Sequence, residues 1–312
     1  MSLYFQSFYN YPSNVNCCVR KHTNQRQGKK NPSLLKLPNE SNINSFSNKS
    51  SSDNSFKVPQ ANVIGIIGGV SVDSSLNFAK KLANLKLENE ENSPPFVLCS
   101  DPALSKELLS LPDKTEHVNI DQSSIVENLR RKRTFLEKSG VCCLVMPCDL
   151  LHCWYDEIKE GCCVPFLHVG ECVAKELKEA KLKPIEAGSP LRIGVLASNE
   201  ALVARFYQEK LENEGFEVIL PDKATVEHTV IPAIEALKRK DFEGAHNLFR
   251  IALQVLLVKA VNRVILASDD LRQLLPPNDP LWRSCIDPMD ALARSSIKYS
   301  QSSVIGKTSL SL

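Results

Sequence analysis

The stretch "CCLVMPCDLLH", residues 142–152, joins a short apolar run to a cysteine, an acid and a histidine. The apolar residues before Pro147 predict a buried strand, and Cys148 stands where that strand ends. His152 follows four residues later, about one helical turn away. Cys148 is therefore a candidate nucleophile, metal ligand or proton-transferring base, or one more buried thiol.

Apolar strands alternate with amphipathic helices from residue 61 onward. This alternation is typical of a parallel α/β protein, in which helices flank the sheet. The predicted strands lie within residues 62–70, 95–103, 141–148, 190–199, 216–221 and 262–270, the predicted helices lie within 71–87, 124–140, 149–161, 200–215 and 231–260, and residues 164–180 repeat the strand-to-helix pattern.

The two halves of this region have similar patterns. Gly65 lies in an apolar strand and precedes Cys148 by 83 residues, and Gly194 lies in a similar strand and precedes Ser268 by 74 residues. The repetition predicts two similar domains, each a parallel sheet flanked by helices. Their expected bounds are 58–168 for the N-terminal α/β domain, with 286–312 packing back on it, and 169–285 for the C-terminal α/β domain.

Ligands of parallel α/β sheets bind beyond the carboxyl ends of the strands. The predicted strands deliver Gly69, Cys148, Ser198 and Ser268 to those ends. We therefore expect the active site in a cleft between the two domains, where these four residues would meet.

Residues 1–57 differ from the rest in composition. They hold eight Lys and Arg, only two acids, eleven Ser and ten Asn, and no continuous apolar segment. A basic, Ser-rich and acid-poor leader of this kind is typical of an organellar transit peptide. We expect delivery to the chloroplast stroma. Mitochondrial import is one alternative, and a disordered tail on a cytoplasmic protein is another.

Composition limits the partners. The formal net charge is only +2, and no block of Lys and Arg marks a nucleic-acid surface. No apolar run reaches the ~18–20 residues that a membrane helix needs, so neither a nucleic acid nor a membrane is expected as a partner. The chain has eleven cysteines but ample aliphatic residues, which favours free thiols over a disulfide scaffold. The cysteines within 142–163 lack the paired knuckles of a structural zinc site, so we expect no metal.

Four motifs, in chain order, carry a resemblance to a known family. They are similar to a strand followed by G-G-M-G-P, then to P-C-N-T-x-H, V-I-L-G-C-T-E and I-D-P-x-x-x-L-A. In the first of them Val70, Ser71 and Val72 stand where Met-Gly-Pro would be. Over about residues 62–300 the chain resembles the cofactor-independent aspartate/glutamate racemases. The matching segments are "IGIIGGVSVDSS" (64–75, with Gly68 and Gly69), "MPCDLLH" (146–152, with Pro147, Cys148 and His152), "VILASDDL" (264–271) and "IDPMDALA" (286–293).

The resemblance implies an amino-acid racemase or isomerase that needs no PLP or other cofactor. It implies a small carboxylate or amino-acid ligand and a possible homodimer. The catalytic positions would be Cys148 and Ser268, and the substrate-binding positions Gly69, Val70, Ser71, Asp149, Leu150, Ser198, Asn199 and Asp269.

The chain departs from the family pattern at positions that bear on activity. Ser268 stands where the second catalytic cysteine would be, and Asp149 and Leu150 replace Asn and Thr after Cys148. After Ser100 and Pro102, Glu107 occupies the approximate position of an arginine that binds the substrate carboxylate in aspartate-type members. Recognition of an acidic amino acid is therefore not implied.

Racemisation without a cofactor needs a base on one face of the α-carbon and an acid on the other. A cysteine suits both roles because its ordinary pKa is near ~8.5, whereas a serine hydroxyl needs a strong helper. Asp269 and Asp270 are candidate helpers of Ser268. His152 either favours the thiolate of Cys148 or serves packing, and we expect Trp154, Tyr155 and Phe166 in the core or at the domain interface.

Three functional hypotheses follow. The first is proton transfer at a carbon next to a carboxylate, with Cys148 acting alone. The second is a non-catalytic paralogue that binds a small carboxylate or regulates a genuine racemase. The third is a thiol-based redox sensor, which only the number of cysteines suggests.

Overall fold

The computed structural model describes residues 62–69, 71–85, 93–101, 122–197, 205–276 and 278–308. The predictions made for the leader and for four site positions fall outside this part of the chain. These positions are Val70, Glu107, Ser198 and Asn199.

The first half builds a three-stranded parallel sheet in the order β2-β1-β3. Its strands are short and apolar, and the central strand is buried along its whole length. The strands are β1 (Ile64–Ile67), β2 (Phe96–Cys99) and β3 (Cys143–Val145), and the helices are α1 (Val72–Asn84), α3 (Gln122–Lys138), the 3₁₀-helix η1 (Leu150–Trp154) and α4 (Tyr155–Lys159).

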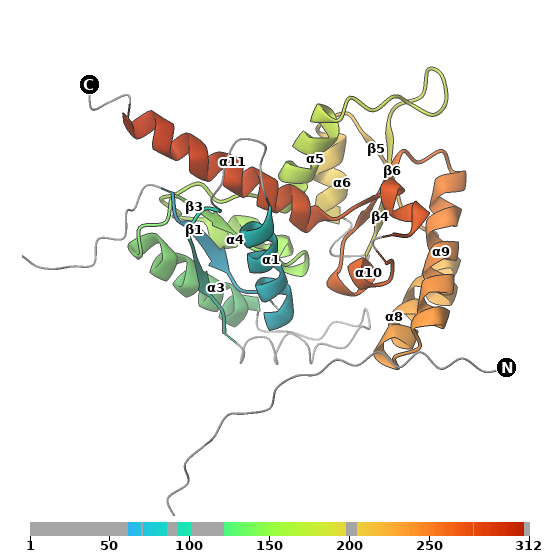
Figure 1. Ribbon diagram of the computed structural model, residues 1–312, viewed down its shortest axis with the longest axis horizontal. Coiled ribbons are helices and arrows are strands. Elements are labelled where there is room, and N and C mark those ends of the chain that lie inside the picture. The colour runs from blue at the N-terminus through green and yellow to red at the C-terminus, as the bar shows by residue number, and fades with distance from the viewer. Residues whose placement is uncertain are drawn as a thin grey trace, which may run out of the picture. The chain divides into compact units, whose positions relative to one another are not determined.

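The second half builds a four-stranded parallel sheet in the order β5-β4-β6-β7. The strands are β4 (Arg192–Leu196), β5 (Glu217–Ile219), β6 (Arg263–Leu266) and β7 (Cys285–Ile286). The helices are α5 (Val169–Glu179), α6 (Arg205–Glu212), α7 (Lys223–Thr225), the π-helix η3 (Val226–Val230), α8 (Ile231–Lys238), α9 (Phe242–Val258), α10 (Asp269–Gln273), the 3₁₀-helix η4 (Pro280–Ser284) and α11 (Pro288–Thr308). Figure 1 shows α8 and α9 side by side, as their contacts require. The predicted α/β class with two parallel sheets is confirmed.

Local sequence signals explain where several helices begin and end. The hydroxyl of Ser71 accepts a hydrogen bond from the backbone N–H of Ser74 at 3.2 Å and caps α1. Gly140 follows α3 with φ +79°, a left-handed conformation that glycine adopts without strain. The strand β7 was missed because two residues carry too little pattern to be recognised. The segment after Cys148 begins as a 3₁₀-helix rather than an α-helix.

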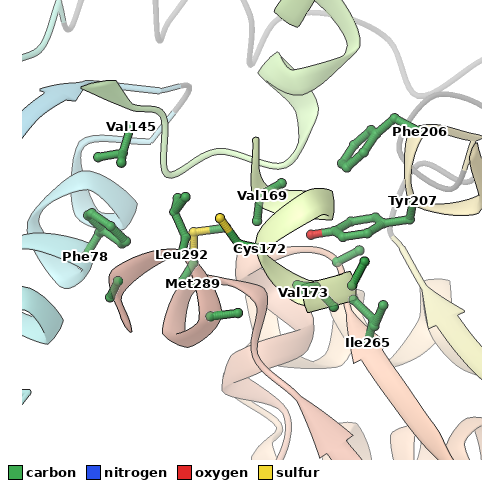
Figure 2. Packing of buried hydrophobic residues seen from close by; sticks show 14 of the residues in the cluster. Phe78, Val145, Val169, Cys172, Val173, Phe206, Tyr207, Ile265, Met289 and Leu292 are labelled. Atoms are coloured by element: carbon green, nitrogen blue, oxygen red, sulfur yellow. The ribbon is translucent and has the colours of Figure 1, made fainter. Parts of the chain in front are cut away.

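One hydrophobic cluster draws residues from both halves of the chain. Figure 2 shows α1 and β3 contributing Phe78 and Val145, α5 contributing Val169, and α6 and β6 contributing Tyr207 and Ile265. Helix α11 packs against α5, α1 and β3, so it lies within this shared core. Both sheets are therefore tied together by apolar burial as well as by the chain connections.

A second cluster lies around α3, η1 and α4. Trp154, Tyr155 and Phe166 belong to it and are buried, as expected for core residues. None of the nine cysteines in the described ranges forms a disulfide bond. Among those same ranges, no helix is long and apolar enough to cross a membrane.

Candidate active site

Cys148 and Gly69 lie at the ends of two neighbouring strands and contact each other. Gly69 follows β1 and Cys148 follows β3, the strand paired with it in parallel. A Cβ atom built on Gly69 would lie 2.4 Å from Cβ of Cys148 and 3.0 Å from its Sγ. Cys148 is buried, with 8% of its surface exposed. Only glycine allows the backbone after β1 to approach the thiol this closely.

Replacing Gly69 with alanine is expected to lower the free energy of unfolding by about 1–3 kcal/mol, because the new methyl group overlaps Cys148. Removing the opposing Cβ with Cys148→Gly should relieve this overlap. The double variant should then lose less stability than the sum of the two single variants. Urea unfolding of the four proteins measures this difference, and strict additivity would contradict the close contact.

His152 is placed for packing. Its Nε2 lies 2.9 Å from the carbonyl oxygen of Met146, and the ring centroid lies 4.7 Å from that of His168. Burial lowers the pKa of His152 to about 4, although the Met146 carbonyl and Asp149 oppose the shift. The imidazole is neutral at pH 7, so it supplies no positive charge that would favour the thiolate of Cys148.

Ser268 follows β6 and caps α10. Its hydroxyl oxygen accepts a hydrogen bond from the backbone N–H of Leu271 at 3.3 Å. The carboxylate of Asp269 accepts hydrogen bonds from the hydroxyl of Ser74 and from Arg272. Burial raises the pKa of Asp269, and Arg272 opposes this shift. Both predicted residues at the end of β6 are therefore already held by hydrogen bonds.

The guanidinium of Arg272 joins the segment after β3, which holds Cys148, to the segment after β6, which holds Ser268. Its Nη1 donates to Asp149 at 2.9 Å and to the carbonyl oxygen of Leu266 at 3.0 Å, and its Nη2 donates to Asp269. Asp149 is the neighbour of Cys148, and Asp269 is the neighbour of Ser268. Arg272 therefore holds the segments after β3 and β6 together. It does so through Asp149 and Asp269, and not through Cys148 and Ser268.

The centre of this network, Arg272 with Asp149 and Asp287, is buried, and the network continues to the start of α11. Arg272 lies 3.6 Å from Asp287, which pairs with Lys81 of α1 at 2.8 Å, and the hydroxyl of Tyr207 donates to Asp149 at 2.7 Å. Burial opposes the charge of Arg272, yet the three carboxylates raise its pKa above the usual value. We refer to Ser74, Lys81, Asp149, Tyr207, Asp269, Arg272 and Asp287 as the Arg272 network.

Sequence analysis missed Arg272, although one signal was present. It lies three residues after Asp269 on α10, so both residues face the same way. Of the other predicted positions, Ser71 serves as the N-cap of α1 and Leu150 packs against apolar residues of both halves. Neither joins the Arg272 network.

Comparison with known proteins supports the same family. The sequence profile of the Asp/Glu/hydantoin racemases matches residues 67–295. The broad specificity amino-acid racemase RacX of Bacillus subtilis (strain 168) is 26% identical over 167 residues, which span 51% of this chain and 65% of RacX, less than two thirds of that protein.

Two crystal structures have a similar fold. The first is a putative Asp/Glu racemase from Yersinia pestis, with TM-score 0.60 and 20% identity over 77% of this chain and 99% of that one. The second is an aspartate racemase homologue from Pyrococcus horikoshii OT3, with TM-score 0.61 and 21% identity over the same shares. The profile covers most of the described residues, and the two sheets agree with it. The chain belongs to the Asp/Glu/hydantoin racemase family.

Proposed function

We propose that the chain transfers a proton at the carbon next to the carboxylate of a small amino acid, with the thiol of Cys148 as the proton-transferring group and without PLP. The observation that carries this proposal is the contact of Cys148 with Gly69 at the ends of β1 and β3. Parallel sheets bind ligands at such ends. The similarity to RacX supports an amino acid as the substrate class.

Proton transfer is limited to one face of the α-carbon because Ser268 is poorly placed to act as a second base. Its hydroxyl oxygen caps α10, and Asp269 is engaged by Arg272 and Ser74. A hydroxyl without a free strong helper is a poor base. The thiolate of Cys148 would take the α-proton, exchange it with solvent and return a proton to the side from which it came.

Exchange without inversion is the expected result in deuterated water. One enantiomer of a suitable amino acid should gain an α-deuteron, as seen by NMR, while chiral chromatography finds little of its mirror image. Cys148→Ala should lower the exchange rate about 10²-fold, because it removes the base. Cys163→Ala, at an exposed cysteine, is the matched control and should leave the rate unchanged.

Ser268→Cys should raise inversion relative to exchange, since it supplies a thiol for the second face. A wild-type protein that inverts both enantiomers at equal rates would contradict transfer on a single face. An exchange rate that survives Cys148→Ala would exclude Cys148 as the base.

A second candidate function is a non-catalytic paralogue that binds a small carboxylate or regulates a genuine racemase. It is favoured by the Arg272 network, in which Asp149, Asp269 and Asp287 of the chain itself engage the guanidinium. Binding of acids without any exchange would support it. A homodimer and a chloroplast location remain predictions.

A further inference from the structure

Buried polar atoms without hydrogen-bond partners gather at the carboxyl end of β2. Among the described residues, no hydrogen bond reaches Nζ of Lys132, Oγ of Ser100 or Oδ1 of Asn128. Most buried polar atoms in native proteins are hydrogen-bonded, so three such atoms in one region call for an explanation.

Asn128 and Lys132 lie close to residues 99–101, the segment that contains Ser100. Asn128 and Lys132 lie one turn apart on α3 and therefore share a face. The amide nitrogen of Asn128 donates to Asp101 at 2.9 Å. Lys132 lies close enough to Cys99 and Asp101 for their charges to act on its pKa. Ser100 is the residue between those two, so the ammonium group and the hydroxyl lie at the same strand end.

This strand end adjoins the loop that contacts Cys148. A Cβ atom built on Gly68 would lie 2.6 Å from Oγ of Ser100, just as one built on Gly69 would overlap Cys148. Strand β1 lies between β2 and β3, and the two glycines that follow it touch Ser100 after β2 and Cys148 after β3. Ser100 and Cys148 are therefore on opposite sides of one short glycine segment.

Nζ of Lys132 makes no hydrogen bond with the described residues, although the charge of Asp101 acts on it and partly opposes the effect of burial. Only 6% of its surface is exposed, and burial lowers its pKa from the usual value. A buried ammonium group without a bound anion is unfavourable, and a carboxylate that reached it would form a charge-assisted hydrogen bond.

We propose that Nζ of Lys132 and Oγ of Ser100 bind the carboxylate of a small acid next to Cys148. The inference rests on the proposed function, because it places the carbon beside that carboxylate near the thiol. It assigns to α3 the cation that recognises the ligand. Lys132 belongs to none of the motifs, and Ser100 gains a role beyond that of a retained family position.

The test compares succinate with succinamide, its uncharged diamide, by isothermal titration calorimetry on the full chain. The wild-type protein should bind succinate at least tenfold more tightly than succinamide. Lys132→Met should weaken succinate binding at least tenfold, and Ser100→Ala should weaken it several-fold. Lys138→Met, at an exposed lysine of the same helix, should leave the dissociation constant unchanged.

Thermal unfolding separates binding from a merely structural role. Lys132→Met removes a buried charge that makes no hydrogen bond within the described residues and keeps an apolar side chain of similar length, so Tm should rise by about 2 °C or more. A lysine needed for the fold would give the opposite change. Loss of binding together with a higher Tm is therefore the signature of a ligand-binding lysine.

Unchanged succinate affinity in Lys132→Met would overturn the inference. So would a wild-type chain that binds none of succinate, L-aspartate and D-aspartate, or one that binds succinate and succinamide equally. These binding measurements need no turnover. Succinate binding that depends on Lys132, without deuterium exchange, would overturn only the proposed function, whereas exchange that persists unchanged in Lys132→Met would overturn only this inference.

Discussion

Arg272→Met is expected to lower the free energy of unfolding by about 3–5 kcal/mol. The guanidinium and its partner Asp149 are both buried, with side-chain exposures of 9% and 5%. Removing one member of a buried, hydrogen-bonded ion pair leaves the other charge without compensation, and this is more destabilising than losing the pair as a whole. Asp287 would lose the same cation and keep its ion pair with Lys81 and the hydrogen bond from the backbone N–H of Met289.

A second substitution tests this explanation. Arg272→Met combined with Asp149→Asn removes both charges and should recover a large part of the lost stability. Arg131→Met breaks an exposed pair with Glu127 and should change stability by less than about 1 kcal/mol. Guanidinium chloride unfolding followed by circular dichroism measures all four proteins. A loss below 1 kcal/mol for Arg272→Met would show that the Arg272 network contributes little to the fold.

Mild acid should destabilise the protein through two buried histidines. His168 accepts a hydrogen bond on Nδ1 from the backbone N–H of Gly170 at 3.0 Å and so caps α5, and both His152 and His168 are 3% exposed. Burial lowers the pKa of His168 to about 2, with further lowering by His152, Lys210 and Lys159. Burial likewise lowers the pKa of His152 to about 4.

The direction of the pH effect follows from these values. The unfolded chain takes up protons on both histidines below the ordinary pKa of about 6.5, while the folded chain does not. Stability is therefore complete above that value and falls as the pH drops from about 6.5 towards 4 for His152 and towards 2 for His168. Between pH 7 and pH 5 the two groups together should remove about 2–4 kcal/mol.

Urea unfolding at several pH values measures this slope. His168→Asn keeps an acceptor that can cap α5 and removes the titrating ring, so it should reduce the slope by about half. His152→Gln should do the same, because its amide can still donate to the Met146 carbonyl. His228→Asn, at an exposed position of η3, should leave the slope unchanged. A slope that persists when both buried histidines are replaced would assign it to carboxylates instead.

The alternation of apolar strands and amphipathic helices made most of the fold predictable from the sequence. The strands β1 and β3 are apolar throughout, and β4 and β6 are apolar after a leading arginine. Glycine or a capping hydroxyl marks the ends of several neighbouring helices. The strand β7 has only two residues, too few for an apolar pattern to predict it. The 3₁₀ geometry of η1 depends on packing rather than on residue type, since His152 and Trp154 are buried there.

The site was less predictable because its members are joined by contacts across long sequence separations. Motifs indicated Gly69, Cys148 and Ser268, and the structure places them at strand ends. Arg272 and Lys132 carried no motif. Arg272 is significant because it is buried and reaches Asp149, a residue 123 positions away, and Lys132 because its buried Nζ finds no hydrogen-bond partner among the described residues. No local pattern encodes either property.

The cap that Ser268 provides for α10 has an evolutionary consequence. Serine is among the preferred N-cap residues and cysteine is not, and losing a good N-cap typically costs about 1 kcal/mol. If an ancestor carried cysteine here, the change to serine strengthened the helix that also presents Asp269 and Arg272. A reverse mutation would weaken that helix before it restored any chemistry. The stability that serine gives to α10 would then oppose reversal to cysteine. The hydroxyl would be retained for this stability and not for catalysis.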